Sequence, residues 1–287
     1  MITAVEDGSD VGLDALALLY PAGASSWTIG VTGAPGAGKS TLVDGLIRGL
    51  RVLDRRVAVV AVDPSSPFTG GAVLGDRIRM QEHAGDDDVL IRSMANRGSL
   101  GGIAESTPRA VAALAGLGFD EVIVETVGVG QAEVDVASAV DTTVVVINPG
   151  WGDSVQAAKA GLLEVGDVFV VNKADRPGAD ATVAELVASL ELSSVDRPVP
   201  VLTAIATEGR GSAELLASIE SHRRDLETSG RLAVKRRLQA AAALRSAVAG
   251  LLRAAATPHA EDRAIVDRIA ARDTDPWSEA RRLLAGG

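Results

Sequence analysis

One glycine-rich segment constrains this chain more than any other. Residues 33–41, GAPGAGKST, fit the pattern GxxxxGK[ST] at every fixed position, after an apolar run and before a helical stretch. Glycines let the backbone curl until consecutive N–H groups point at one anion, and a helix N-terminus adds partial positive charge. The segment therefore predicts a phosphate-binding loop. Its residues are Gly33, Ala34, Pro35, Gly36, Ala37, Gly38, Lys39, Ser40 and Thr41.

Short apolar runs alternate with helical stretches from Trp27 to about Ala206. Most runs are continuously apolar, which is typical of strands buried on both faces of a parallel sheet. This rhythm predicts an α/β fold with a doubly wound, mostly parallel sheet and ligand binding beyond the carboxyl ends of the strands. Strands are expected over residues 27–33, 57–63, 89–94, 121–126, 142–148, 168–173 and 199–205. Crossover helices are expected over residues 39–50, 103–117, 153–164 and 180–191.

The chain changes character after Gly211. Residues 212–256 read as helix with a break near Ser229-Gly230, residues 260–272 read as a further helix, and Asp275-Pro276 opens a last short one. The Ala and Leu side chains of the apolar stripe need a partner. This region is therefore either a helical cap on the sheet or an oligomerisation arm.

Composition excludes several classes of function. The chain has 28 basic and 38 acidic residues, a formal net charge of −10, and no cysteine. The absence of cysteine excludes a disulfide scaffold, a thiolate metal site and a cysteine nucleophile, and the negative balance argues against a nucleic-acid surface. No membrane-spanning run or secretory signal is present in the sequence, so we expect a cytoplasmic protein. The dispersed histidines, His83, His222 and His259, lack metal-ligand spacing.

The sequence NKAD, residues 172–175, ends the sixth expected strand and predicts guanine recognition. The carboxylate of Asp175 can accept hydrogen bonds from N1–H and the exocyclic amine of guanine, a pair of donors that adenine lacks. Asn172 is expected to brace the loop, and the stem of Lys173 to pack on the face of the base. With the phosphate loop upstream, the motif predicts a site for GTP and GDP.

Carboxylates at other strand ends predict a magnesium site. Glu125 closes the fourth expected strand and faces the phosphates, and the N–H of Gly128 can approach the γ-phosphate. Asp63 ends the second expected strand, where the alternative is a capping or turn role, and Asp76 lies in LGDRIRM. Lys39 is expected on the β- and γ-phosphates. Magnesium is expected on Ser40, Asp63, Asp76 and Glu125.

No residue is an obvious base for the attacking water. Val129 follows Gly128, at the place where many GTPases carry a water-positioning glutamine, and Gln131 is a substitute two positions further on. The sequence therefore predicts slow intrinsic hydrolysis that a partner accelerates.

The blocks GAPGAGKST, VDPSSPFTGGAVLGDRIRM, ETVGVGQAEVD and NKAD together resemble the MeaB/ArgK family of SIMIBI-class P-loop GTPases. The resemblance runs over nearly the whole chain and includes the C-terminal DPWSEARRLL. It implies a GTP-hydrolysing chaperone that gates cofactor loading and protects an adenosylcobalamin-dependent methylmalonyl-CoA mutase, or a related acyl-CoA mutase. It also implies a homodimer joined through helical extensions.

The resemblance carries over to single residues. Family metal positions match Ser40, Asp63, Asp76 and Glu125, and NPGWGDSVQAAK (148–159) matches a loop that responds to the partner, with Lys159 as its charged catalytic contributor. The base-contacting Ser-Ala loop of the family aligns with Ile205, Ala206 and Thr207, where the serine is lost but the N–H of Ala206 could serve the guanine oxygen.

The resemblance also sets the expected domains. Residues 1–26 form an N-terminal helical segment that looks truncated, residues 27–211 the P-loop GTPase domain, and residues 212–287 a helical dimerisation arm.

Three other functions remain open at this point. A nickel or cobalt metallochaperone of the same GTPase class needs His or Cys ligands near a switch, which this sequence lacks. An arginine/ornithine transport-associated NTPase is the older family label, and NKAD disfavours its use of adenine. A binding module without turnover is the third, and an intact Lys39 and Ser40 argue against it.

Overall fold

The computed structural model describes residues 1–64, 81–83, 85–96, 106–126, 132–150, 156–192, 198–260 and 262–285. Contacts divide the chain into two compact units, Met1–Gln239 and Ala240–Gly287. Each unit is considered by itself.

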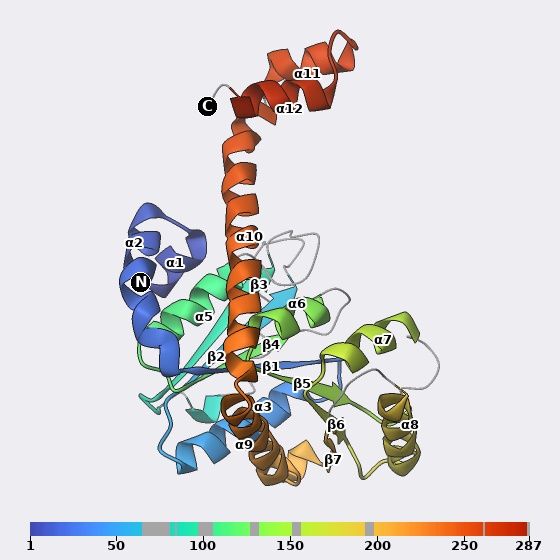
Figure 1. Cartoon of the computed structure of the whole chain (residues 1–287). Helices are drawn as coiled ribbons and strands as arrows, with labels where there is room; N and C mark the ends of the chain where they lie inside the picture. The colour runs from blue at the N-terminus through green and yellow to red at the C-terminus, as the bar shows by residue number, and fades with distance from the viewer. Residues whose placement is uncertain are drawn as a thin grey trace. The chain divides into compact units, whose positions relative to one another are not determined.

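The first unit is built on a seven-stranded sheet in which every neighbouring pair of strands is parallel (Figure 1). The strand order is β3-β2-β4-β1-β5-β6-β7. The strands are β1 (Trp27–Gly33), β2 (Val57–Pro64), β3 (Val89–Asn96), β4 (Glu121–Thr126), β5 (Thr142–Ile147), β6 (Val168–Asn172) and β7 (Val201–Ala204). The predicted doubly wound parallel sheet is confirmed, because each expected run forms a strand.

Helices cover both faces of this sheet. On one face lie α3 (Lys39–Val52) and α9 (Ser212–Thr228), whose buried leucines pack with Ile29 and Val31 of β1. Other helices pack on the opposite face. Those are α5 (Ser106–Gly116), α6 (Ala132–Ala139), α7 (Gln156–Val165) and α8 (Ala179–Glu191).

The central strands are buried throughout, as their continuous apolar sequences predict. Every residue of β4, β5 and β6 is buried. Side chains alternate between the two faces, so Val144 and Val146 join the core under α3 while Val145 and Ile147 join the core under α7 and α8. The sheet is therefore a rigid platform whose carboxyl edge can hold a site.

Two short helices precede the sheet, α1 (Ile2–Asp7) and α2 (Asp10–Leu19), followed by the 3-10 turn η1 (Tyr20–Ser25). Glu6 of α1 forms an ion pair with Arg92 of β3 at 2.6 Å, and Arg109 of α5 donates to the Glu6 carbonyl at 2.8 Å. These contacts hold the N-terminal helices beside the edge strand β3.

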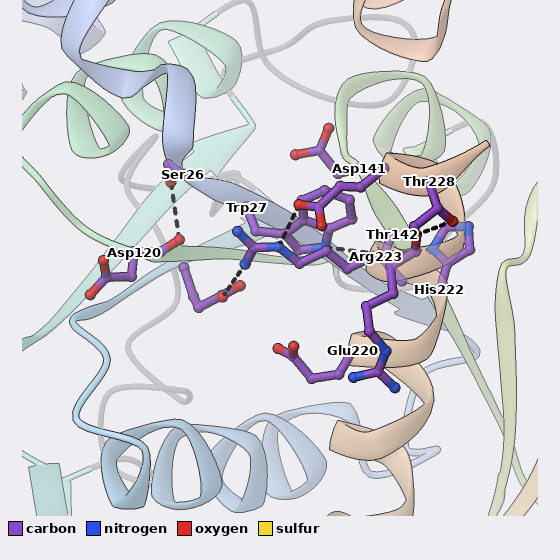
Figure 2. Close-up of polar contacts among 12 residues, drawn as sticks. Ser26, Trp27, Asp120, Asp141, Thr142, Glu220, His222, Arg223 and Thr228 are labelled. Atoms are coloured by element: carbon purple, nitrogen blue, oxygen red, sulfur yellow. Dashed lines mark hydrogen bonds and ion pairs between the residues drawn. The ribbon is translucent and has the colours of Figure 1, made fainter. Parts of the chain in front are cut away.

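A polar network holds α9 to the amino edge of the sheet (Figure 2). The indole Nε1 of Trp27 donates to Thr142 Oγ1 at 3.0 Å, and His222 Nδ1 lies 3.0 Å from the same hydroxyl. His222 Nε2 lies 3.3 Å from a carboxylate oxygen of Asp167. Because buried polar groups are costly unless they are paired, this chain of contacts fixes how α9 meets β1 and β5.

The first turns of α10 (Arg231–Ala260) also meet the amino edge. Lys235 donates to the carbonyl of Asp141 at 2.7 Å, and Arg236 binds the buried carboxylate of Asp141 at 3.0 and 3.1 Å. Gln239 donates to the carbonyl of Val140 at 2.7 Å. These bonds bring residues 231–239 into the first unit.

The second unit contains the rest of α10, α11 (Arg263–Ala270) and α12 (Pro276–Ala285). Asp275 caps α12 by accepting from the N–H groups of Trp277 and Ser278 at 3.0 and 2.9 Å. Among the side chains described for this unit, Glu279 is the buried one, paired with Arg268 and Arg282. Taken alone, the described part of this unit therefore has no apolar core.

None of the helices described for this chain is both long enough and apolar enough to cross a membrane.

A buried carboxylate at the start of β4 makes stability depend on pH. Glu121 accepts from Arg55 at 2.6 Å and lies 3.3 Å from Arg223, while Glu220 shares Arg55. Burial raises the pKa of Glu121 from 4.5 to about 7 and outweighs the two arginines, which lower it. Between pH 4.5 and about 7, Glu121 therefore keeps its proton in the folded chain and loses it in the unfolded chain.

We predict that the free energy of unfolding falls as pH rises from about 4.5 to about 7, by up to about 3 kcal/mol from this group. Glu121→Gln has no titrating proton and should remove that component. Urea unfolding of the wild type and of the variant at pH 5, 6 and 7 measures how steeply the free energy of unfolding of each depends on pH. Equal slopes for the wild type and the variant would show that Glu121 does not titrate in this range.

Candidate nucleotide-binding site

The candidate site lies at the carboxyl edge of the sheet, where the strand order reverses direction. β1 lies between β4 and β5, and the chain passes from β1 to β2 on one side and later from β4 to β5 on the other. Doubly wound sheets bind ligands at such a position, because loops leave it in opposite directions and open a crevice. The segment 33–41 leaves β1 at this point.

Two glycines allow the loop its shape. Gly33 has φ 133°, and a Cβ there would lie 2.0 Å from the carbonyl oxygen of Val146. Gly38 has φ 95° and precedes α3, and a Cβ there would lie 2.2 Å from Asn172 Nδ2. A side chain at either position would meet a neighbouring strand end, so the close approach of loop and sheet requires glycine.

Lys39 and Ser40 begin α3 and are buried, although both are polar. Lys39 Nζ donates to the carbonyls of Gly33 and Ala34 at 2.8 and 3.0 Å, which holds its ammonium against the first residues of the loop. The first N–H groups of a helix have no partner within that helix. Ammonium and helix N-terminus together can hold a phosphate group.

The end of β4 meets the start of α3. Ser40 Oγ donates to Glu125 Oε1 at 2.6 Å, and Glu125 is 4% exposed. Thr126 donates to the hydroxyl of Thr32 at 3.1 Å and so ties β4 to β1 beside the loop. A hydroxyl and a carboxylate are the hard oxygen donors that magnesium prefers, and Ser40 keeps lone pairs while its proton is donated. These residues fit a magnesium ion.

Asn172, at the end of β6, joins the phosphate loop to the loop after β7. Its Nδ2 donates to the carbonyl of Ala37 at 2.8 Å, and its Oδ1 accepts from the N–H of Ala206 at 3.0 Å. The side chain is 2% exposed. Lys173 has φ 58°, and its ammonium donates to the carbonyl of Gly36. Asn172 is therefore hydrogen-bonded to both loops.

The loops after β6 and β7 lie side by side. The N–H of Ala174 donates to the carbonyl of Ala204 at 3.0 Å, and Ile205 pairs with Arg210 across the turn that contains Ala206 and Thr207. Asp175 is exposed at this edge. Because the N–H of Ala206 already donates to Asn172, contact with a guanine oxygen requires that this bond be shared or exchanged.

Other expected site residues cannot be placed. Asp76, Gly128 and Gln131 lie outside the described residues. Asp63 belongs to β2 and Lys159 to α7, but their side chains lie outside the description as well.

The sequence interpretation missed one contact near the site. The Nε2 of His83, one of the dispersed histidines without metal-ligand spacing, lies 2.8 Å from Asp44 Oδ1, and both side chains are largely buried. The available signal was the helical spacing of Ser40 and Asp44, which places both on one face of α3.

Comparisons with known proteins identify the family of this chain. The family model of methylmalonyl-CoA mutase-associated GTPase MeaB matches residues 1–260. This chain belongs to the MeaB family. It is therefore a P-loop GTPase, and its ligand is a guanine nucleotide. The fold and the family predicted from the sequence are both confirmed.

Individual relatives support the MeaB assignment. A Pyrococcus abyssi protein whose name describes it as a GTPase is 47% identical over 293 residues, which cover 99% of this chain and 90% of the relative. GTPase ArgK of Escherichia coli is 40% identical over 223 residues, 76% of this chain and 67% of ArgK. The crystal structure of an LAO/AO transport system kinase has a TM-score of 0.68 at 27% identity, with 99% of this chain and 95% of that chain covered.

We predict that Gly38→Ala destabilises the chain more than Gly36→Ala. Both glycines have positive φ, but a Cβ at Gly38 collides with the Asn172 amide, whereas nothing lies within 4 Å of a Cβ at Gly36. Gly36→Ala is the matched control and should lower the free energy of unfolding by about 1 kcal/mol through backbone strain alone. Gly38→Ala should lower it by about 2–4 kcal/mol. Urea unfolding of both variants measures the difference. Equal costs would show that the contact with Asn172 does not constrain the loop.

Proposed function

We propose that this chain is a GTP-hydrolysing, magnesium-dependent chaperone that gates cofactor loading of an adenosylcobalamin-dependent acyl-CoA mutase and protects that mutase. The observation that carries the nucleotide part is that Asn172 donates to the carbonyl of Ala37 and accepts from the N–H of Ala206, which sets the phosphate loop and the loop after β7 at a fixed separation. The mutase as client, with methylmalonyl-CoA as its substrate, rests on the MeaB family match.

In this proposal the loop backbone of residues 33–41 and Lys39 hold the phosphates. Lys39 exchanges its contacts with Gly33 and Ala34 for contacts with the β- and γ-phosphates. Asp175, exposed at the end of β6, accepts from the guanine N1–H and amine. Binding buries this carboxylate, so a base without those donors leaves it unpaired and is rejected.

Magnesium is assigned to the oxygens of Ser40 and Glu125, with Asp63 and Asp76 as the further carboxylates. Bound there, the ion would neutralise the charge that develops on the transferred phosphoryl group. The 2.6 Å bond from Ser40 to Glu125 holds both oxygens at the start of α3. Glu125 therefore orients the hydroxyl as well as supplying charge.

Three further residues are assigned roles in hydrolysis: Gln131 and Gly128 lie outside the described residues, and Lys159 lies in α7 with its side chain outside the description. Gln131 is proposed to position the water, Gly128 to contact the γ-phosphate, and Lys159 to contribute charge when the partner is bound. A site completed by a partner gives slow hydrolysis in its absence.

The exposed side chains of the second unit support the proposal of a homodimer. Leu244, Leu251 and Trp277 are each at least 66% exposed, and the described part of this unit has no apolar core to stabilise it. Large exposed apolar side chains, here Leu244 and Leu251 on α10 and Trp277 on α12, are typical of a protein–protein interface. A second copy of this chain is the proposed partner in a helical dimerisation arm.

The proposed location is the cytoplasm, because a chain without cysteine forms no disulfide and needs no oxidising compartment.

The test is steady-state hydrolysis of GTP and of ATP, with and without a purified adenosylcobalamin-dependent acyl-CoA mutase. We predict slow turnover of GTP, none of ATP, and at least a tenfold rise with the mutase, equivalent to about 1.4 kcal/mol off the barrier. Lys39→Ala is the inactive control, because it removes the ammonium that binds the phosphates.

Each outcome separates the parts of the proposal. GTP hydrolysis that ignores the mutase would contradict the client and keep the GTPase. Preference for ATP would contradict the role of Asp175 and favour a transport-associated NTPase.

A further inference from the structure

Two buried threonines form a hydroxyl pair between β1 and β4. Thr126 Oγ1 donates to Thr32 Oγ1 at 3.1 Å, and the two residues are 1% and 0% exposed. Thr126 is the last residue of β4, and Thr32 comes directly before Gly33, the first residue of the phosphate loop. The pair therefore joins the strand that carries Glu125 to the strand from which the phosphate loop leaves.

The register of the sheet places this pair at the end of β4. β1 and β4 are paired in register up to Val31 and Glu125, and Thr32 and Thr126 occupy the next position on each strand. On its other side, β4 is paired with β2 up to Val62 and Thr126. The hydroxyl bond holds the same residue on the β1 side. Because the ends of an element open more easily than its middle, a side-chain bond at this point restrains the end of the strand.

Glu125 and Thr126 point to opposite faces of the sheet. Side chains alternate along a strand, and in β4 Ile123 packs in the core under α3 while Val124 packs in the core on the other face. The Glu125 carboxylate therefore faces α3, where its Oε1 accepts from Ser40 at 2.6 Å. The hydroxyl pair lies on the opposite face, so it acts on this carboxylate through the backbone that neighbouring residues share.

We propose that Thr126 and Thr32 are positioning residues for the magnesium site. Their bond sets how far the end of β4 lies from the start of the phosphate loop, and so where the Glu125 carboxylate meets the Ser40 hydroxyl. Neither threonine ligates the ion. The inference rests on the proposed function, since it presumes that magnesium binds the oxygens of Ser40 and Glu125.

A positioning role can be separated from a purely structural one. Thr126→Val removes the donor and leaves the Thr32 hydroxyl buried without this partner, which destabilises the fold. Changing both threonines to valine keeps the shape and leaves no polar group behind, so stability should recover. The bond that restrains the strand end is missing in both variants. Magnesium affinity therefore stays low in the double variant if the pair positions Glu125, and recovers with stability if the pair only satisfies buried hydroxyls.

The experiment follows binding of a fluorescent GDP analogue to the full chain as magnesium is raised, and in EDTA. We predict that Thr126→Val raises the magnesium concentration for half-maximal effect at least threefold, while affinity in EDTA changes by less than twofold. Thr126→Ser keeps a hydroxyl donor and should restore most of the magnesium affinity. Thr32→Val combined with Thr126→Val should keep the magnesium requirement raised at least threefold, although urea unfolding shows recovered stability.

Thr143→Val is the matched control. Thr143 is a fully buried threonine near the start of β5, where its N–H donates to Asp167 at 2.9 Å, so it lies at the amino edge of the sheet. Among the residues that the structure describes, its hydroxyl has no hydrogen-bond partner. The same chemical change at this position should therefore leave the magnesium requirement within twofold of the wild type.

The outcomes are distinct. A shift below threefold for Thr126→Val, an equal shift for Thr143→Val, or a double variant that regains both stability and magnesium affinity would overturn the positioning role and leave the proposed function intact. Wild-type binding that ignores magnesium would contradict the magnesium site, and this inference with it. Should Thr126→Val not fold, the double variant supplies the comparison, and an unshifted magnesium requirement there would equally overturn the proposal.

Discussion

The nucleotide site depends on one buried amide. Asn172 donates to the phosphate loop at Ala37 and accepts from the loop after β7 at Ala206, both within 3.0 Å. A buried amide that loses either partner pays the cost of an unsatisfied group, so the two loops are held as a pair. Because β6 is buried along its whole length, packing in the core of the sheet fixes the position of Asn172 at its end.

The two edges of the sheet have different tasks. At the carboxyl edge, polar side chains face outward and can meet phosphate, magnesium and base. At the amino edge, Trp27, Thr142 and His222 form a closed chain of contacts that holds α9 against the strands. α3 connects the two, since it starts at the phosphate loop and carries Asp44 and its neighbours toward the opposite edge.

Much of this was predictable from the sequence, for identifiable reasons. Continuous apolar runs predicted the strands within a few residues, because a strand buried on both faces is apolar along its whole length. For example, β4 was predicted over residues 121–126 and has those bounds. The glycine pattern located the phosphate loop, since few sequences can adopt it. Contacts between distant residues could not be predicted: His83 and Asp44 carry no motif, and the engaged N–H of Ala206 depends on how two loops meet.

We propose that a guanine base lies at the end of β6, against Asp175. The most direct measurement is the affinity of the wild type and of Asp175→Asn for GTP and for xanthosine triphosphate. We expect the variant to lose at least tenfold in GTP affinity and to gain affinity for xanthosine triphosphate by a similar factor, because an amide offers a donor where the carboxylate accepts. Wild-type GTP affinity in Asp175→Asn would contradict the placement of the guanine base against Asp175.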